Sequence, residues 1–273
     1  MQPIISVIIP AFKPQDYIYK NLEALHLQTL SQEQFEVIIV LNGPKEPYYN
    51  DLSAYIAAHA DNVKLYYSEN PGVSNARNKG IELSCGQYLT FIDDDDWVSN
   101  TYLESLLFQA NTENIVTSNF TIIDDSTGEE TDQYLNYLPK VYQRLKGKEN
   151  PSFFAARSFL SPPVGKLIHR DIIGSCRFNT KFALGEDSLF CFEISKNIRH
   201  IRLSSEDAIY YVRIRKESAS HRHYTYWFRV KLALRTSCEY FRLYLKNPTQ
   251  YNIPLFISRV VATLRKLIHK AYD

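Results

Sequence analysis

Four consecutive aspartates, Asp93–Asp96, stand directly after an apolar segment and directly before Trp97. Adjacent carboxylates repel one another, and a hard divalent cation that prefers oxygen ligands relieves the repulsion. In extended backbone, residues i and i+2 project to the same side, so Asp93 and Asp95 can face one metal, or a metal and a ribose. The plainer alternative is a solvated loop in which Asp96 caps the next helix.

Two further polar segments come at predicted helix starts. The first covers residues 70–80, where free backbone amides and Arg77 suit an anion or the edge of a base. The second is the acidic pair Glu186-Asp187, which suits the positive end of a helix. The respective alternatives are an amphipathic helix with Arg77 in solvent and simple helix capping by the acidic pair.

Apolar patterning predicts the elements that position these residues. Nearly continuous apolar runs predict buried strands over residues 4–9, 35–41, 63–67 and 87–92. Helical spacing is found between them around residue 22, over 48–60, and from a turn at 70–72 to about 84. This alternation predicts a right-handed, doubly wound α/β domain, in which ligands bind at the carboxyl ends of the strands. Candidate residues that fall at such ends are Pro10, Asn42, Asn70 and Asp93–Asp96.

Beyond residue 110 the patterning weakens, and we expect a polar insertion or flexible excursion over 124–150. We then expect a strand over 164–169, a helix over 185–196 and a strand over 208–212. Two basic amphipathic helices follow, the second beginning at Pro254. The apolar stripe of the first consists of Trp227, Val230, Leu234, Cys238, Phe241 and Leu245. That of the second contains Val260, Val261, Leu264, Leu267, Ile268 and Ala271, and basic residues, Arg259 among them, flank both.

The chain has 273 residues, 45% of them hydrophobic and 22% charged. These values are ordinary for a globular protein and exclude a disordered or collagen-like chain. Residues 1–210 carry 18 Lys/Arg and 27 Asp/Glu, a net −9, whereas residues 211–273 carry 13 and 3, a net +10. A basic tail on an acidic body predicts a polyanionic partner or a membrane surface. Nucleic acid is not expected, because the sequence contains no recognition motif for it.

The four cysteines form no CxxC pair and no zinc-type cluster with histidines. We expect buried, reduced thiols in a cytoplasmic protein. The N-terminus lacks a basic n-region and a small-residue cleavage site, so no signal peptide is expected. No window reaches the roughly 18 apolar residues that a membrane span needs.

Five motifs lie in order along the chain: residues 6–11 (SVIIPA), 37–43 (VIIVLNG), 70–80 (NPGVSNARNKG), 86–97 (GQYLTFIDDDDW) and 185–187 (GED). Together they resemble family 2 glycosyltransferases of the GT-A fold. The resemblance is dense over 1–110 and does not cover the tail. It implies a doubly wound, mostly parallel mixed sheet with helices on both faces, plus a C-terminal helical extension.

The resemblance also implies a division of the chain and a donor site. Residues 1–222 would form the transferase domain, with a donor half (1–110) and an acceptor half (111–222), followed by the basic extension 223–273. The donor-nucleotide site would be formed by Pro10, Ala11, Phe12, Asn42, Asn70, Arg77, Asp93 and Asp94.

Within that implied site, Pro10, Ala11 and Phe12 line the pocket for the base, and Arg77 contacts the base or a neighbouring carboxylate. Asn42 stands where the family usually has an aspartate that reads the base. Its side-chain oxygen still accepts an N–H from a uracil-like base, because asparagine keeps an acceptor.

The catalytic and metal roles follow from the same resemblance. Asp93 and Asp95 correspond to the DxD pair, in which Asp93 holds the ribose and Asp95 binds Mg²⁺ or Mn²⁺. Asp187 corresponds to the general base, with Glu186 beside it. His221 is a further metal-ligand candidate in a basic loop.

In that basic loop, Arg215 or Arg222 is a candidate phosphate ligand, and a solvated surface is the alternative. Lys166 resembles a family position of unclear role, and a structural ion pair is an equal alternative. For the extension, the alternatives are packing on its own domain, a homo-oligomer interface, or peripheral binding to an anionic membrane with Trp227, Tyr224 and Tyr226 near the headgroups.

The chemistry that the resemblance implies is sugar transfer from a nucleoside diphosphate sugar, with UDP favoured, to a glycan or lipid-linked hydroxyl in surface polysaccharide synthesis. A divalent ion neutralises charge on the leaving diphosphate, and a single carboxylate base with in-line attack gives inversion. A nucleotidyltransferase would need a glycine-rich loop after the first strand, where this chain has Pro10-Ala11-Phe12. A degenerate, non-catalytic sugar-nucleotide-binding module is a third hypothesis, for which Asn42 leaves room.

Overall fold

The computed structural model describes residues 2–59, 61–131, 137–215 and 225–268. Its strands are β1 Ile5–Ala11, β2 Phe35–Asn42, β3 Val63–Ser68, β4 Tyr88–Phe91, β5 Trp97–Val98, β6 Asn114–Thr117, β7 Asn119–Asp124, β8 Lys166–His169, β9 His200–Leu203 and β10 Ile209–Ile214. Its helices are α1 Tyr17–His26, α2 Tyr48–His59, α3 Val73–Leu83, α4 Tyr102–Gln109, α5 Tyr137–Leu145, α6 Arg170–Ile173, α7 Glu186–Ile194, α8 Tyr226–Lys246 and α9 Ile253–Ile268. Short 3₁₀ turns cover Gln32–Gln34, Arg157–Leu160 and Ser195–Asn197.

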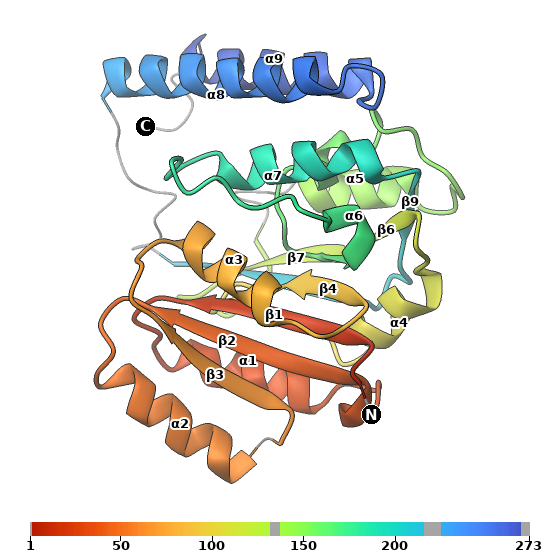
Figure 1. The fold of residues 1–273 in the computed structure, drawn as a ribbon. Helices are drawn as coiled ribbons and strands as arrows, with labels where there is room; N and C mark the ends of the chain where they lie inside the picture. Colours follow the sequence, from red (N-terminus) through yellow and green to blue (C-terminus); the bar gives the residue numbers. More distant parts are fainter. Residues whose placement is uncertain (1, 60, 132–136, 216–224, 269–273) are drawn as a thin grey trace.

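The central sheet has seven strands in the order β3-β2-β1-β4-β8-β6-β9 (Figure 1). β3, β2, β1 and β4 run parallel, whereas β8 is antiparallel to both β4 and β6. Every residue of β1 and β2 is buried, because helices cover both faces of this part of the sheet. The expected mostly parallel, mixed α/β sheet is therefore confirmed.

Alternating side chains of β2 show how the two faces are filled. Val40 packs in a small cluster with Ala76 of α3, whereas Ile39 belongs to the main core, which also contains Leu22 of α1. Helix α3 approaches the sheet closely at Gly80, where a Cβ would lie 2.3 Å from Cγ2 of Ile8. Any larger residue at Gly80 would push α3, and the Arg77 that it carries, away from the sheet.

A second, three-stranded sheet in the order β5-β10-β7 follows the four aspartates. β5 is only Trp97–Val98, and it pairs antiparallel with β10, which in turn runs parallel to β7. This small sheet brings β10, more than 110 residues further along the chain, next to the aspartate cluster.

The expected polar excursion over 124–150 is wrong for residues 137–145, which form helix α5. The buried side chains of α5 are Leu138, Val141, Tyr142 and Leu145, which follow the i, i+3, i+4, i+7 spacing of a helix face. Only four apolar residues in a polar stretch carry this signal. Residues 132–136 lie outside the described part of the chain.

Helices α8 and α9 lie side by side over α7 at one end of the molecule (Figure 1). The inner face of α8 buries Ala233, Thr236, Ser237, Tyr240 and Leu243. The apolar stripe predicted from the sequence faces outward instead, with Trp227 77% and Leu245 70% exposed. Arg259, expected among the exposed flanking residues, is buried, and its Nη2 donates to the carbonyl of Arg157.

Within the described residues, no helix is both long and apolar enough to span a bilayer.

Candidate active site

Arg77 of α3 is the centre of the candidate site. Its side chain is only 3% exposed, and its Nη2 donates to Oδ1 of Asp93 at 2.8 Å while its Nη1 donates to Oδ1 of Asp187 at 2.5 Å. The guanidinium also lies over the Phe178 ring, 5.3 Å from its centroid. Arg77 is therefore not on a solvent face, and the predicted DxD aspartate and the predicted base share one guanidinium.

Helix α3 is fixed to the segment before α7 by the residue after Arg77. Asn78 Nδ2 donates to the Phe178 carbonyl at 2.9 Å, and the Phe178 N–H donates to Asn78 Oδ1 at 2.8 Å. Gly185, with φ +84°, then starts α7 in a left-handed conformation that side chains disfavour. These contacts place the first turn of α7 beside the middle of α3 and beside the aspartates that follow β4.

The acidic pair at the start of α7 has two different environments. Glu186 is buried, and burial together with the charge of Asp187 raises its pKa to about 7. Burial also raises the pKa of Asp187, although Arg77 opposes the shift. The Asp187 side chain is 34% exposed, and no described residue bonds its Oδ2. Asp187 therefore presents a solvent-reachable carboxylate oxygen, whereas Glu186 does not.

Asp94 and Asp95 extend the cluster towards β1 and β10. Asp94 Oδ2 accepts the backbone N–H of Phe12 at 3.1 Å, and Asp95 Oδ2 accepts from Nε of Arg215 at 3.1 Å and also from its Nη2. Burial and the charge of Asp95 raise the pKa of Asp94 to about 8. Burial and Asp93 likewise raise the pKa of Asp95, against the opposing effect of Arg215. The cluster thus holds more negative charge than its neighbours compensate.

That excess charge bears on the implied divalent cation. The donor set consists of carboxylate oxygens, which Mg²⁺ and Mn²⁺ prefer, and Arg215 already supplies a cation to Asp95. Among the residues that the structure describes, no three His, Cys, Asp or Glu side chains converge as a complete metal site. The residues fit a cation that takes its other ligands from phosphates and water, as Mg²⁺ commonly does.

Asp96 does not cap the next helix, contrary to that alternative. It is buried, and it accepts from the Tyr210 hydroxyl at 2.8 Å and from the Arg213 N–H at 2.9 Å. The same tyrosine oxygen accepts the backbone N–H of Asp93 at 3.1 Å. Helix α4 starts later, after Thr101. Asp96 therefore anchors β10 to the aspartate loop.

The predicted base-pocket residues lie at the ends of β1 and β2. Pro10 and Ala11 are buried, whereas Phe12 is 54% exposed and packs beside Gly43, where a Cβ would lie 2.7 Å from its ring. Asn42 is buried at the end of β2, and its Nδ2 donates to the carbonyl of Gly72 at 2.6 Å. No described residue donates a hydrogen bond to its Oδ1, so the Asn42 side chain keeps one acceptor available.

Not every predicted residue joins the site. Asn70 is exposed, and its side chain makes no hydrogen bond to a described residue. His221, Arg222 and Tyr224 lie outside the described residues. The structure therefore brings together the ends of β1 and β4, the buried side of α3 and the start of α7.

Lys166 forms no ion pair with any residue that the structure describes, which argues against the structural ion pair. Its fully buried Nζ donates to the carbonyls of Pro162 and, at 3.0 Å, Val164. Burial lowers its pKa to about 8, partly offset by Cys191 and Asp187. Lys166 is therefore a buried amine held by carbonyls, close enough to the predicted base Asp187 for their charges to interact.

Sequence reasoning missed Tyr210 and Asn21, which support the aspartate loop. Tyr210 is fully buried between Asp93 and Asp96, and Asn21 Nδ2 donates to the Asp93 carbonyl at 3.0 Å. A polar tyrosine at a core-facing position of the predicted strand 208–212 was the available signal. Asn21, a buried polar residue on the apolar face of α1, was a second.

The expectation of buried thiols holds for two of the four cysteines. Cys176 and Cys191 are buried, and Cys85 and Cys238 are exposed. All four are free thiols, so the structure contains no disulfide.

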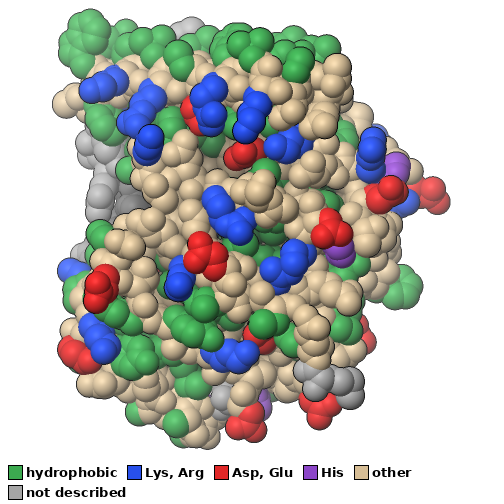
Figure 2. Space-filling view, in the orientation of Figure 1, with side chains coloured by type: hydrophobic (Ala, Val, Ile, Leu, Met, Phe, Trp, Pro, Cys, Tyr) green, Lys and Arg blue, Asp and Glu red, His purple; other side chains and the backbone are tan. Residues whose placement is uncertain are grey.

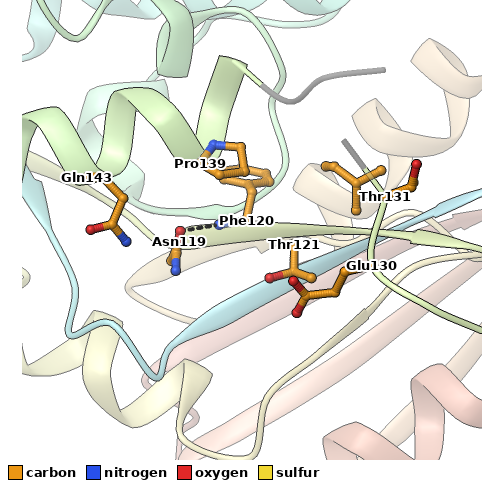
Figure 3. Close-up of a pocket in the computed structure, with 8 residues that line it drawn as sticks. Asn119, Phe120, Thr121, Glu130, Thr131, Pro139 and Gln143 are labelled. Atoms are coloured by element: carbon orange, nitrogen blue, oxygen red, sulfur yellow. Dashed lines mark hydrogen bonds between the residues drawn. The ribbon is translucent and has the colours of Figure 1, made fainter. Parts of the chain in front are cut away.

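A separate pocket of about 450 Å³ lies between β7 and α5 (Figure 3). Asn119, Thr121 and Glu130 line it together with Pro139 and Gln143 of α5. It contains none of the predicted site residues, so it is distinct from the cluster around Arg77.

Comparison with known proteins gives a family match. The protein-family sequence model described as "Glycosyl transferase family 2" matches residues 6–175 of this chain. The glycosyltransferase GlyA of Streptococcus pneumoniae is 31% identical over 232 residues, 79% of this chain and 31% of that protein. An uncharacterized glycosyltransferase of Haemophilus influenzae is 28% identical over 90% of this chain and 96% of its own length. The minor teichoic acid biosynthesis protein GgaB of Bacillus subtilis is 26% identical over 79% of this chain and 23% of its own. The chain thus spans less than a third of GlyA and GgaB.

Two solved structures share the fold. The crystal structure of TarS residues 1–349 from S. aureus, in complex with UDP-GlcNAc, superposes with a TM-score of 0.70 at 18% identity, covering 98% of this chain and 72% of that one. The mannosyltransferase PcManGT of Pyrobaculum calidifontis, in complex with GDP-Man and Mn²⁺, gives 0.67 at 14% identity, covering 98% and 73%. At these identities the likeness establishes a common GT-A architecture.

Proposed function

This chain belongs to glycosyl transferase family 2, and from that premise we propose that it transfers a sugar, with inversion, from a nucleoside diphosphate sugar to a hydroxyl group. UDP-sugar is the favoured donor. A glycan or a lipid-linked carrier is the proposed acceptor, in the synthesis of a surface polysaccharide.

One observation carries this proposal. Arg77 bonds the DxD residue Asp93 and the base candidate Asp187 at the same time. A donor held at the aspartates and an acceptor hydroxyl at Asp187 would then meet within one site, as an in-line displacement requires.

Asp187 is the proposed general base. The bond from Arg77 to its Oδ1 fixes the carboxylate, and the solvent-reachable Oδ2 is left to take the proton from the attacking hydroxyl. Glu186, buried beside it, is the less suitable base because substrate cannot reach it, and the charge of Asp187 helps to raise its pKa. A single base at this position supports direct displacement and therefore inversion.

Asp95, with Asp93, is proposed to hold Mn²⁺ or Mg²⁺. When bound, the cation would neutralise charge on the diphosphate leaving group. Because Arg215 pairs with Asp95, that side chain must move to make room or turn to the phosphates. Asn42 Oδ1 is proposed to accept an N–H from the base, which favours uracil.

The neighbours support this donor class. The TarS structure holds UDP-GlcNAc and the PcManGT structure holds GDP-Man with Mn²⁺, so the fold accommodates nucleotide sugars of either base. GgaB, named for teichoic acid synthesis, supports a surface polymer as product. The four free cysteines support a reducing compartment, which we propose is the cytoplasm.

The test is a thermal-shift panel of nucleoside diphosphate sugars, with and without Mn²⁺, followed by turnover assays. A ligand that binds only the folded form raises the melting temperature by mass action. We expect a UDP-sugar with Mn²⁺ to give the largest shift and slow hydrolysis without acceptor. Binding without hydrolysis or transfer would favour the non-catalytic module, and no shift with any nucleotide sugar would overturn the proposal.

A further inference from the structure

The outer face of α8 and α9 is apolar and uncovered in the described structure. Its large side chains are between 38% and 77% exposed. They are Trp227, Leu234, Phe241 and Leu245 of α8 and Ile253, Ile257, Val261 and Leu264 of α9. We call these eight residues the helical platform. On each helix they recur at steps of three, four or seven, which places them in one stripe.

The platform is a second apolar side of each helix, and it does not face the core. Helix α8 buries Ala233, Thr236 and Ser237 together with Tyr240 and Leu243, and α9 buries Leu255 and Phe256. A water-exposed helix normally has one apolar stripe, which faces inward, whereas these two helices also carry an apolar stripe on the outside. The two helices pack along each other, so their stripes form one band, visible along the upper edge of Figure 2. An exposed band of this extent marks an interaction surface.

The charge around the platform is strongly positive. Residues 226–268 contain eight Lys/Arg and a single acid, Glu239. Glu239 is paired with Arg242, so it leaves no free negative charge. Figure 2 shows Lys and Arg side chains in a row directly below the apolar band. On α8, Lys231, Arg235, Arg242 and Lys246 lie along one edge of the stripe and are exposed.

We infer that the helical platform docks on an anionic lipid bilayer. The apolar stripe would enter the boundary between headgroups and acyl chains, and the basic row beside it would meet the lipid phosphates. A second copy of this chain is the poorer occupant, because two such basic rows facing each other would repel. At 1.5 Å per residue, α8 provides about 30 Å of contact along the membrane.

The platform lies directly over the helix that carries the proposed base. Tyr240, on the inner face of α8, hydrogen-bonds Ser188, which follows Asp187. A Cβ on Gly185 would lie 3.8 Å from Thr236. One helix layer, about 10 Å thick, thus separates Asp187 from the proposed membrane surface. If the proposed transfer reaction holds, this placement favours an acceptor anchored in the bilayer over a free glycan.

The test is co-sedimentation of the full chain with phosphatidylcholine vesicles, with and without phosphatidylglycerol. We expect binding to the anionic vesicles, and weakening by salt. A variant with Trp227→Ser, Leu234→Ser and Ile257→Ser should bind at least about tenfold more weakly, since each side chain loses its apolar burial. In a second variant, Lys231→Glu with Lys246→Glu, the affinity for anionic vesicles should fall about fivefold or more for each lysine replaced.

Matched controls use equally exposed residues elsewhere. Phe108, 85% exposed at the end of α4, is changed to Ser, and Lys140 and Lys148 are changed to Glu; vesicle binding should not change. Melting temperatures confirm that each variant is folded. Absence of vesicle binding, equal binding by the platform and control variants, or a dimer in sedimentation that the platform variants abolish would each overturn the proposal. Donor hydrolysis should be unchanged in the platform variants, so failure of membrane docking is distinguishable from failure of the proposed transferase activity.

Discussion

Nη1 of Arg77 lies 2.5 Å from Oδ1 of Asp187, although 110 residues separate the two in the sequence. The guanidinium is almost completely buried, and it is satisfied on its other side by Asp93. Burial alone would lower the pKa of Arg77, but the two carboxylates raise it overall. A permanent positive charge therefore joins the end of β4 to the start of α7.

Arg77→Met should uncouple these two carboxylates. We expect transfer to fall about a hundredfold, because the loss of one positioning contact misplaces the proposed base. Arg77→Lys keeps the charge but cannot reach both carboxylates with a planar fork, so it should recover only part of the activity. Kinetics of both variants, with circular dichroism to check folding, measure this. If Arg77→Lys were as active as the native protein, bridging by the fork would not matter.

Asp187→Asn should lower the rate of transfer by about 10²- to 10⁴-fold, because an amide cannot take the proton from the acceptor hydroxyl. Nucleotide affinity should persist, because the amide oxygen still accepts the hydrogen bond from Arg77. Calorimetry with UDP and turnover assays separate the two effects. Loss of UDP binding, or retained turnover, would contradict the assignment of Asp187 as base.

Glu186→Gln should leave the acidic limb of the pH–rate profile in place. The charge of Asp187 helps to raise the pKa of Glu186 to about 7, so Asp187 ionises first, while Glu186 is still neutral. Replacing Glu186 by a neutral amide therefore changes no charge beside Asp187 over the pH range in which the proposed base ionises. A pH–rate profile whose acidic limb moves in the glutamine variant would show that Glu186 ionises before Asp187.

Arg215→Gln should tighten Mn²⁺ binding in the absence of donor by about tenfold, because Asp95 loses the guanidinium that competes for its oxygens. Asp95→Asn should weaken it. Lys79→Gln, which removes the same charge from an exposed site on α3, serves as the matched control. Calorimetric titration with Mn²⁺ measures all three. Equal tightening in the Lys79 variant would attribute the effect to net charge alone.

Lys166→Met should change how stability depends on pH. In the folded state the Lys166 pKa is lowered from 10.5 to about 8, so between these values the unfolded chain binds more protons than the folded one. Native stability contributed by this site therefore rises as pH increases from about 8 towards 10.5. From pH 7 to pH 10, the unfolding free energy of the native protein should rise by about 2–3 kcal/mol relative to that of the methionine variant. Urea unfolding at the two pH values provides the measurement, and a constant difference would mean that Lys166 is not a buried cation.

The sequence was enough to predict β1 to β4 and β8, because these segments are apolar runs of the length typical of buried strands, but it did not predict β6 and β9 of the same sheet. It also located the aspartates, Arg77 and the acidic pair at strand and helix ends. It did not predict the partners of Asp95 and Asp96. Those depend on β10 packing beside β5, a tertiary contact that leaves no local signal.

The orientation of α8 was unpredictable for a different reason. Periodicity identified a helix with an apolar stripe, but a second inward set, including Tyr240 and Leu243, is buried instead. When a helix is amphipathic on two sides, spacing does not tell which side faces the core. Helix α5 was missed because its buried side chains span only about two helical turns and are embedded in polar residues.

The side-chain amide of Asn78 makes two hydrogen bonds to the main chain of Phe178, one through its N–H and one through its oxygen. This pair of bonds does not depend on the side chain at position 178, but it does depend on Asn78. Consider a chimera in which residues 1–110 of this chain replace the corresponding part of a relative. Asn78 should form the same two hydrogen bonds there if the backbone before the relative's acidic pair has the same conformation. Swapping Asn78 for aspartate, which lacks the donor, should separate the two parts even when every other contact is native.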